Sequence, residues 1–255
     1  MKLAEITFSP TGGTQRVADI VAGEFEGTLC RVDLTDAKAD LGEVALTAED
    51  IAVIAVPSYG GRVPATAAER IGKISGNRAR CVIICVYGNR AYEDTLVELK
   101  DIAAESGFKV VAAISAVAEH SIMHQYAAGR PDDKDGAELR EFAAEIMQKI
   151  RAGADGEDIV LPGNRPYKKA GAAGMVPKAN GSCTNCGLCA EKCPVQAISR
   201  ENCKITDKTK CISCMRCVAV CPQAARGVSK VMVSVASLAL KKACSVRKNN
   251  ELFIG

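Results

Sequence analysis

Two copies of one cysteine spacing constrain this chain more than any other feature of its sequence. The copies are two C-x2-C-x2-C-x3-C-P runs, and their cysteines are Cys183, Cys186, Cys189, Cys193, Cys211, Cys214, Cys217 and Cys221. Pro194 and Pro222 follow the last cysteine of each run. This spacing is the ligand pattern of a [4Fe–4S] cluster, and two runs in tandem predict two clusters.

The fourth ligand of each cluster is expected to come from the other run. Three thiolates spaced by two residues can surround one corner of a cubane from a single tight loop, but the fourth cannot easily follow from the same loop. We therefore expect Cys221 to complete the first cluster and Cys193 the second. Residues 183–199 also align with residues 211–227, sharing the cysteines, the proline and an alanine, as a pseudo-symmetric pair of cluster sites would.

Residues 178–228 resemble the bacterial-type two-cluster ferredoxins, and the resemblance implies a small α+β domain. Other interpretations of the cysteines are less favoured. A disulfide framework needs an oxidising compartment, and the chain opens MKLAEITF, without a basic region followed by a long apolar run. Structural zinc usually uses more widely separated cysteine pairs, or histidines. Thirteen cysteines without an export signal favour a reducing cytoplasm.

The other five cysteines are expected to pack rather than to bind metal. Cys30, Cys81 and Cys85 lie in apolar runs, where a free cysteine behaves as a small hydrophobe. Cys203 lies between the two cluster loops, and Cys244 lies in a late, helical pattern. For both of these, packing is favoured over chemistry.

The composition indicates a globular chain without a membrane span or a nucleic-acid partner. It is 48% hydrophobic and 25% charged, and no apolar stretch approaches the length of a span. The net charge of +3 is too small to indicate nucleic-acid binding.

We divide the chain at a change in composition. Residues 153–182 are rich in Gly, Pro and Lys without lasting periodicity, which predicts a linker laid over a surface. A domain at 1–152 precedes it, and a two-cluster domain at 183–228 follows. The helix and tail predicted at 229–255 carry Val231, Val235 and Leu238 at helical spacing, and we expect this helix to pack the two domains together.

Five apolar runs alternate with helical patterns in residues 1–152. The runs cover residues 3–8, 29–34, 50–57, 80–87 and 109–117. Helical stripes lie at 17–25, 92–103 and 139–150. Five strands alternating with helices predict a doubly wound α/β fold with a five-stranded parallel sheet. Such sheets bind ligands at the carboxyl ends of the strands, where the strand order reverses.

The first of three loops at predicted strand ends is suited to a phosphate. It contains Ser9, Thr11, Gly12, Gly13 and Thr14, whose hydroxyls and small size let helix N-terminal N–H groups surround an anion. It is neither a Walker A loop nor a G-x-G-x-x-G loop. It resembles the T-x-T-G-N-T loop of flavodoxins, which holds the phosphate of FMN, with Gly13 in place of the usual Asn. A simple N-cap turn is the alternative.

The other two loops follow the third and fourth predicted strands. They contain Pro57, Ser58, Tyr59, Gly60 and Gly61, and Tyr87, Gly88, Asn89, Arg90 and Tyr92. In flavodoxin-like folds these loops flank the isoalloxazine ring of FMN, so the resemblance makes Tyr59 and Tyr87 or Tyr92 the stacking candidates. Arg62 and Arg90 are either contacts to the pyrimidine or a partner, or solvated loop charges.

A histidine pair follows the fifth predicted strand. His120 and His124 are four residues apart, but the sequence lacks H-E-x-x-H and suggests no third metal ligand. We expect a loop near the flavin or the cluster domain, with Glu119, His120 and Ser121 as polar contacts.

Together, the loops and the cysteine runs resemble the flavodoxin–ferredoxin fusion family, which carries FMN and two [4Fe–4S] clusters in one chain. The resemblance implies an anaerobic electron-transfer flavoprotein that acts with a redox protein such as a soluble ferredoxin, a flavodoxin or an oxidoreductase. Two alternatives stay open: an FMN-dependent reductase of a small molecule such as a quinone, and a redox sensor. The lack of an acid–base constellation or a nicotinamide fingerprint favours the electron carrier.

Overall fold

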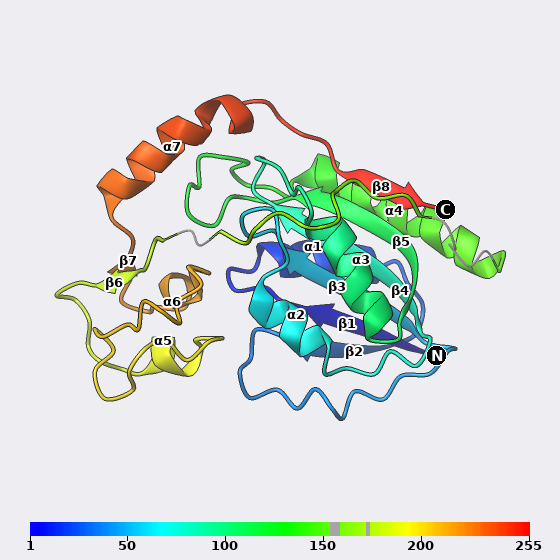
Figure 1. Ribbon diagram of the computed structural model, residues 1–255, viewed down its shortest axis with the longest axis horizontal. Helices are drawn as coiled ribbons and strands as arrows, with labels where there is room; N and C mark the ends of the chain where they lie inside the picture. Colours follow the sequence, from blue (N-terminus) through cyan, green and yellow to red (C-terminus); the bar gives the residue numbers. More distant parts are fainter. Residues whose placement is uncertain (154–158, 172–173) are drawn as a thin grey trace.

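The computed structural model describes residues 1–153, 159–171 and 174–255. A large sheet domain lies beside a smaller domain that contains the cysteine runs (Figure 1). The strands are β1 (Lys2–Thr7), β2 (Thr28–Asp33), β3 (Ile51–Pro57), β4 (Arg80–Tyr87), β5 (Lys109–Val117), β6 (Lys178–Ala179), β7 (Arg226–Gly227) and β8 (Glu251–Ile254). The helices are α1 (Gly13–Ala22), α2 (Ala65–Ile71), α3 (Thr95–Glu105), α4 (Asp133–Arg151), α5 (Leu188–Glu191), α6 (Arg216–Ala219) and α7 (Lys230–Cys244).

The large sheet has the strand order β2-β1-β3-β4-β5-β8. Its first five strands are parallel, and each matches a predicted run to within one residue at either end. β3, β4 and β5 are buried along almost their whole length, because α1 and α4 pack on one face and α2 and α3 on the other. The predicted doubly wound α/β fold is confirmed.

Two local predictions differ from the structure. Cys30 is exposed rather than packed, because β2 is the edge strand of the sheet and shows five of its six residues to solvent. The helical stripe predicted from residue 92 begins only at Thr95, so Tyr92 belongs to the preceding loop. Cys81 and Cys85 lie in the central strand β4 and are fully buried, as predicted.

A sixth strand, which the sequence did not suggest, closes the large sheet. β8 pairs antiparallel with β5, so the chain returns to the first domain after passing through the second. Asn250 fixes this return: its Oδ1 accepts a hydrogen bond from the Val117 N–H at 2.9 Å, and its Nδ2 donates to Asp135 at 3.2 Å. Asp135 also pairs with the buried Arg130 and with Arg247.

The described part of the linker is fastened along the start of α3. The Asp94 carboxylate accepts hydrogen bonds from the backbone N–H groups of Asn164 and Lys168, at 2.9 and 2.7 Å. Arg165 forms two hydrogen bonds to Asp101. The predicted linker at 153–182 partly falls outside the described residues, at 154–158 and 172–173, but the described part is laid over a surface.

The small domain is built from two matching halves. α5 and α6 occupy equivalent positions of the internal repeat and follow the second cysteine of each run. β6 and β7 form a two-stranded antiparallel sheet at one edge. Its core contains Cys189, Cys193, Cys203 and Cys217 with Ala197 and Ile198.

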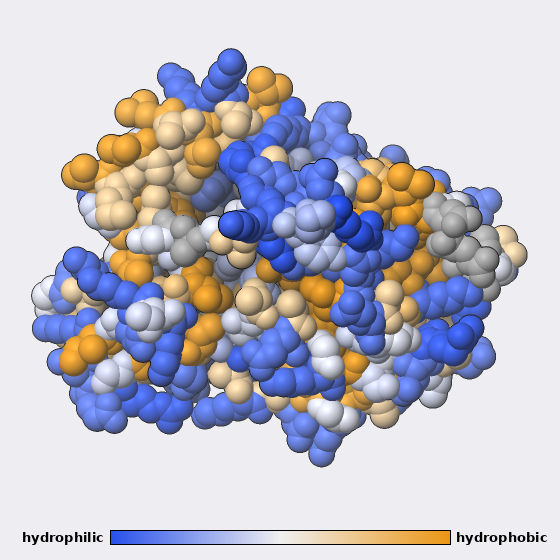
Figure 2. Space-filling model, in the orientation of Figure 1, coloured by the Kyte–Doolittle hydropathy of each residue, from blue (hydrophilic) through white to orange (hydrophobic). Residues whose placement is uncertain are grey.

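The apolar stripe predicted to pack α7 faces outward instead. Val231, Val235 and Leu238 are 74%, 64% and 72% exposed, and an apolar face is visible over this helix in Figure 2. The opposite face packs, because Met123 and Tyr126 of the loop after β5 meet Val233 and Leu240 there. Cys244 is buried against the same loop, as predicted. Among the described residues, no helix combines the length and apolarity needed to cross a membrane.

Candidate functional site

Each half of the small domain surrounds a cavity lined by four of the predicted ligand cysteines. Cavity I is lined by Cys183, Cys186, Cys189 and Cys221. Cavity II is lined by Cys193, Cys211, Cys214 and Cys217. The last cysteine of each run therefore lies at the cavity of the other run, which is the arrangement that the exchange of ligands requires. The thiols fit two [4Fe–4S] clusters, each held by four cysteines.

The backbone of each cysteine run bends in the same way. Three pairs of residues at equivalent positions of the repeat have positive φ. They are Asn185 and Ser213, Gly187 and Met215, and Gln196 and Ala224. Such left-handed residues let a short loop curl its side chains toward one point. The turn at each third pair also aims a backbone N–H at a ligand sulfur: Ala197 donates to Cys193 at 3.3 Å, and Ala225 donates to Cys221 at 3.2 Å.

The thiols of cavity II influence each other across the two runs. The pKa of the Cys214 thiol is raised to about 12, first by burial and further by Cys193, Cys217 and Cys211. Thiols of this kind bind iron only after losing their protons, so cluster assembly in this cavity is coupled to proton release. A site for a single metal ion is a different arrangement. Among the described residues, no group of three or more His, Cys, Asp or Glu side chains is close enough together to hold one ion.

Cys203 also lines cavity I, beyond the four predicted ligands. It is 1% exposed and its backbone N–H donates to Asn185 at 2.7 Å. This burial agrees with the prediction that Cys203 packs. Its position in the sequence, between the two runs, did not indicate that it lies beside the predicted ligands.

The loop after β1 has the geometry of an anion cradle. Gly12 has a φ of 90° and open space where a Cβ would stand. Ser9 Oγ accepts a hydrogen bond from Gln15 N–H at 2.9 Å, which closes the loop onto the start of α1. No hydrogen bond within the described residues uses the N–H groups of Gly12, Gly13 or Thr14. These donors at a helix N-terminus fit the phosphate of FMN.

The loop after β3 lies beside cavity II. Ser58 N–H donates to Val86 O at 2.8 Å, which holds the loop beside the end of β4. Burial raises the pKa of Tyr59 well above its usual value, and Cys214 raises it further, so the phenol lies near a predicted cluster ligand.

Gly60 approaches Gly171 of the linker, since a Cβ at Gly60 would stand 3.5 Å from the Gly171 carbonyl. Pro57 ends β3, and Gly61 lies against Glu93.

The loop after β4 is engaged by the C-terminal segment. Asn89 Nδ2 donates to the carbonyls of Cys244 and Val246, both at 2.8 Å. Tyr92 donates its hydroxyl to Glu251 at 2.7 Å, and its ring meets that of Tyr87 edge-on. Asn89 and Tyr92 are therefore held by contacts to the C-terminal segment. Of the three stacking candidates, Tyr59 is the one that lies near the small domain.

Both arginines of these loops form ion pairs within the chain. Arg90 pairs with Glu93 at 3.0 Å, and Arg62 pairs with Glu98 at 2.7 Å while lying over the ring of Tyr167. Arg62 therefore ties the loop after β3 to α3 and to the linker.

The two histidines do not share a site. His120 Nδ1 accepts hydrogen bonds from the N–H groups of Ile122 and Met123, and burial lowers its pKa. His124 pairs instead with Glu119 at 2.7 Å. The His120 ring packs against Gly88, where a Cβ would clash with it at 2.7 Å, so this loop does lie next to one of the candidate flavin loops.

The small domain presents cavity II to the large domain. Arg216 of α6 donates to the carbonyl of Pro10 in the phosphate loop at 3.2 Å. Arg70 of α2 donates to the carbonyl of Pro194, which follows the last cysteine of the first run, at 2.7 Å. Ile212, between two cavity II ligands, packs against the core of the large domain. Sequence reasoning missed Arg70 and Arg216, because neither lies in a motif that indicates a contact between domains.

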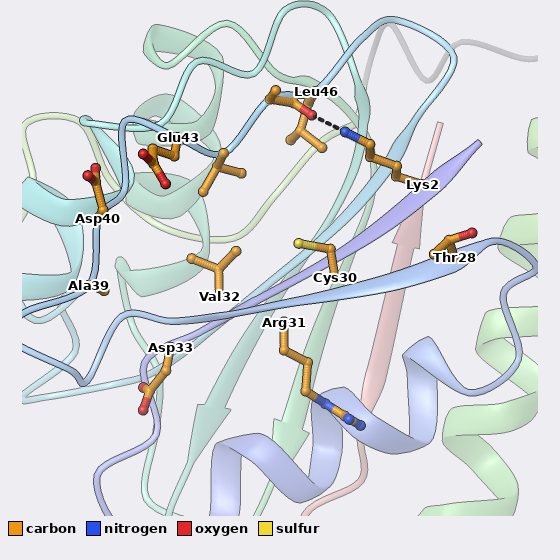
Figure 3. A pocket seen from close by; sticks show the side chains of 12 residues that line it. Lys2, Thr28, Cys30, Arg31, Val32, Asp33, Ala39, Asp40, Glu43 and Leu46 are labelled. Carbon is orange, nitrogen blue, oxygen red and sulfur yellow. Dashed lines mark hydrogen bonds between the residues drawn. The ribbon is translucent and has the colours of Figure 1, made fainter.

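A hollow at the edge strand β2 is separate from these loops. Figure 3 shows Cys30 and Val32 of β2 facing the segment that carries Asp40 and Glu43, with Lys2 hydrogen-bonded to the carbonyl of Ala45 at 3.0 Å. None of the predicted site residues lines it.

Comparison with known proteins agrees with this architecture. The 4Fe-4S dicluster domain family matches residues 182–226. The large sheet has the order 2-1-3-4-5 of flavodoxin-like folds, with an added antiparallel strand. The chain is thus a fusion of a domain with a flavodoxin-like fold and a segment that matches the 4Fe-4S dicluster family.

Solved structures that resemble the fusion cover about half of it. A flavodoxin from Streptococcus pneumoniae TIGR4 is 21% identical, with a TM-score of 0.41, over 58% of this chain and 99% of that one. A flavodoxin from the domain Archaea is 14% identical, with a TM-score of 0.43, over 59% and 99% of the two chains. An NADH:FMN oxidoreductase (EMOB) is 15% identical, with a TM-score of 0.43, over 58% and 89%. At these values the fold assignment rests on the strand order. No curated protein sequence matches the chain.

Single substitutions test the exchange of ligands between the two runs. We expect Cys193→Ser to damage the cluster of Cys211, Cys214 and Cys217, and Cys221→Ser to damage the cluster of the first run. Cys203→Ser should leave the iron content of the anaerobically purified chain unchanged. Electron paramagnetic resonance (EPR) of the reduced variants shows which cluster is damaged, and iron analysis measures the iron content. The exchange is refuted if each serine variant damages the cluster of its own run, and Cys203 becomes the ligand if its loss, rather than that of Cys221, removes cluster I.

Proposed function

We propose that the fusion is an electron-transfer flavoprotein in which two [4Fe–4S] clusters exchange electrons with FMN and, through it or through the clusters, with a redox protein partner. The observation that carries this proposal is the position of cavity II beside the candidate flavin loops. Cys214 lies near Tyr59, and Arg216 reaches the phosphate loop. When bound, FMN supplies a carrier of one or two electrons, whereas each cubane normally carries one.

The eight cysteines of the two cavities would hold the clusters. The cluster of cavity II would be the one nearer the flavin, and the cluster of cavity I would be the outer one, with Cys186 exposed at its edge. An exposed edge gives a partner protein a place to deliver or take an electron. This order of sites, from partner to outer cluster to inner cluster to flavin, is a chain of carriers within one molecule.

The large domain would hold the flavin with the three loops at the carboxyl ends of β1, β3 and β4. The free N–H groups of Gly12, Gly13 and Thr14, with the Ser9 and Thr11 hydroxyls nearby, are the proposed phosphate site. Tyr59 is the proposed stacking residue, and the backbone of residues 57–61 and 87–92 would border the ring. The side chains of Asn89 and Tyr92 act instead by attaching the C-terminal segment.

Electron transfer is favoured over reduction of a small molecule because the small domain and the linker both approach the candidate flavin loops. Arg216 contacts the phosphate loop, and Gly171 of the linker lies against Gly60. Coverage of this kind limits access to the flavin for a free substrate and shortens the path from a cluster.

A charge at the phosphate loop should separate binding of FMN from binding of riboflavin, which lacks the phosphate. Thr11 is exposed, so Thr11→Asp can be tolerated by the fold while placing a carboxylate beside the phosphate. Repulsion between charges about 4 Å apart near a protein surface is about 4 kcal/mol, or roughly three orders of magnitude in affinity. We expect FMN affinity, measured by quenching of flavin fluorescence, to fall by that factor, while riboflavin affinity stays unchanged.

Thr11→Ser is the matched control and should bind both flavins as the unaltered chain does. Equal loss of FMN and riboflavin in Thr11→Asp would indicate damage to the ring site. Unchanged FMN affinity would show that the phosphate lies elsewhere.

Loss of the inner cluster should disconnect the flavin from its electron supply. With FMN retained, Cys214→Ala should slow reduction of the flavin by a reduced low-potential ferredoxin at least about tenfold, equivalent to about 1.4 kcal/mol of barrier. The rate is read from the loss of flavin absorbance in a stopped-flow instrument. The buried Cys81→Ala variant of β4 is the control for cysteine substitution and should keep the original rate. A rate unaffected by Cys214→Ala would contradict the proposal and favour a sensor.

A further inference from the structure

Arg226 is a buried cation without a carboxylate partner among the described residues. It begins β7, is 4% exposed, and donates to the carbonyls of Cys203 and Pro177 at 2.5 and 3.1 Å. It also donates to Thr206 Oγ1 at 2.7 Å, while its Nε atom is buried without a hydrogen-bond partner in the described residues. A buried guanidinium held only by neutral acceptors is costly unless an anion lies nearby.

The side chain of Arg226 lies between the two cavities. It lines cavity I, where its Nη1 atom lies 3.8 Å from the sulfur of Cys189, a predicted ligand. Its Nη2 atom donates to Pro177 O and Thr206 Oγ1, and both of these residues line cavity II. One guanidinium therefore borders the sites of both predicted clusters.

The internal repeat shows that this arginine is not duplicated. The residue equivalent to Arg226 in the first half is Ile198, which is 6% exposed and lines cavity II. The neighbouring positions are matched: Ala197 and Ala225 each donate to a ligand sulfur. At this position of the repeat, one half therefore carries a buried arginine and the other an apolar residue, where symmetry alone would give either two arginines or none.

Clusters held by four thiolates each would supply an anion beside this arginine, because such clusters are negatively charged in the oxidised state and more so when reduced. A cation beside a cluster, and an N–H donor to its sulfur, both favour the reduced state and raise the reduction potential. Two reduced clusters in one small domain also repel each other in surroundings of low dielectric constant. A fixed positive charge between them does not change that mutual repulsion, but its attraction to each cluster offsets it for both.

We propose that Arg226 is a shared electrostatic bridge that raises the reduction potentials of both clusters. The proposal rests on the cluster ligands proposed above. It gives the domain a means to hold two electrons together, which is the number that a flavin can accept.

Redox titration of the cluster-loaded full chain, followed by EPR, tests the bridge. We expect Arg226→Gln to shift both midpoint potentials to more negative values, whereas the potentials of Arg226→Lys, which keeps the charge, should lie between those of Arg226→Gln and those of the original chain. Arg200→Gln is the matched control, because Arg200 is an exposed arginine of the same domain and is screened by solvent. It should leave both potentials in place.

Cys193→Ser and Cys221→Ser, each of which should lack one cluster, identify which potential belongs to which cavity. A shift confined to one cluster, or shifts no larger than those of Arg200→Gln, would overturn the bridge. Iron analysis separates these outcomes from a loss of clusters, which would concern the ligands instead.

Arg226→Lys keeps the bridge testable if Arg226→Gln fails to assemble clusters. It retains the charge with fewer donors, so both potentials should fall slightly below those of the original chain. A fall confined to one cluster in this variant would contradict the bridge.

Discussion

Attachment of the small domain at both ends is the constraint on which the rest of this structure depends. The incoming linker is fixed by Asp94 and Asp101 on α3, and the outgoing chain is fixed by Asn89, Asn250 and the pairing of β8 with β5. A domain held at two points loses less freedom when it docks than a domain on one flexible tether, because its effective concentration at the docking face is high. Contacts as few as those of Arg70 and Arg216 can then set which cavity faces the large domain.

The small domain combines a symmetric frame with asymmetric additions. The frame consists of the crossed cysteines, the left-handed loop residues and the paired N–H donors to sulfur, and it recurs with the period of the sequence repeat. The additions are Arg226 between the halves, Cys203 at cavity I, and Ile212 and Arg216 on the side of cavity II that meets the large domain. Symmetry provides two similar clusters, and the additions give them different neighbours.

Motifs with a short-range physical cause could be predicted from the sequence. The cysteine spacing, the five strands of the parallel sheet and the turn from β1 into α1 each depend on residues close together in the chain. β8 could not be predicted, because four residues at the end of a chain carry little periodicity and this strand exists only through its pairing with β5. The outward face of α7 was also predicted wrongly, since Val231, Val235 and Leu238 have the spacing of a packed face and only the position of Tyr126 decides which side is covered. Arg226 could have been noticed from the repeat, where it replaces an apolar residue.

Electron transfer within one molecule is the central claim of this account, and the kinetics of flavin reduction test it most directly. A chain loaded with both clusters and FMN is mixed with excess reduced low-potential ferredoxin, and the loss of flavin absorbance is followed over a wide range of chain concentrations at a fixed donor concentration. If the docked small domain delivers the electrons, the step from cluster to flavin is first order, with a rate constant independent of chain concentration. A rate constant that rises in proportion to chain concentration would show that electrons pass between molecules, and would contradict the account.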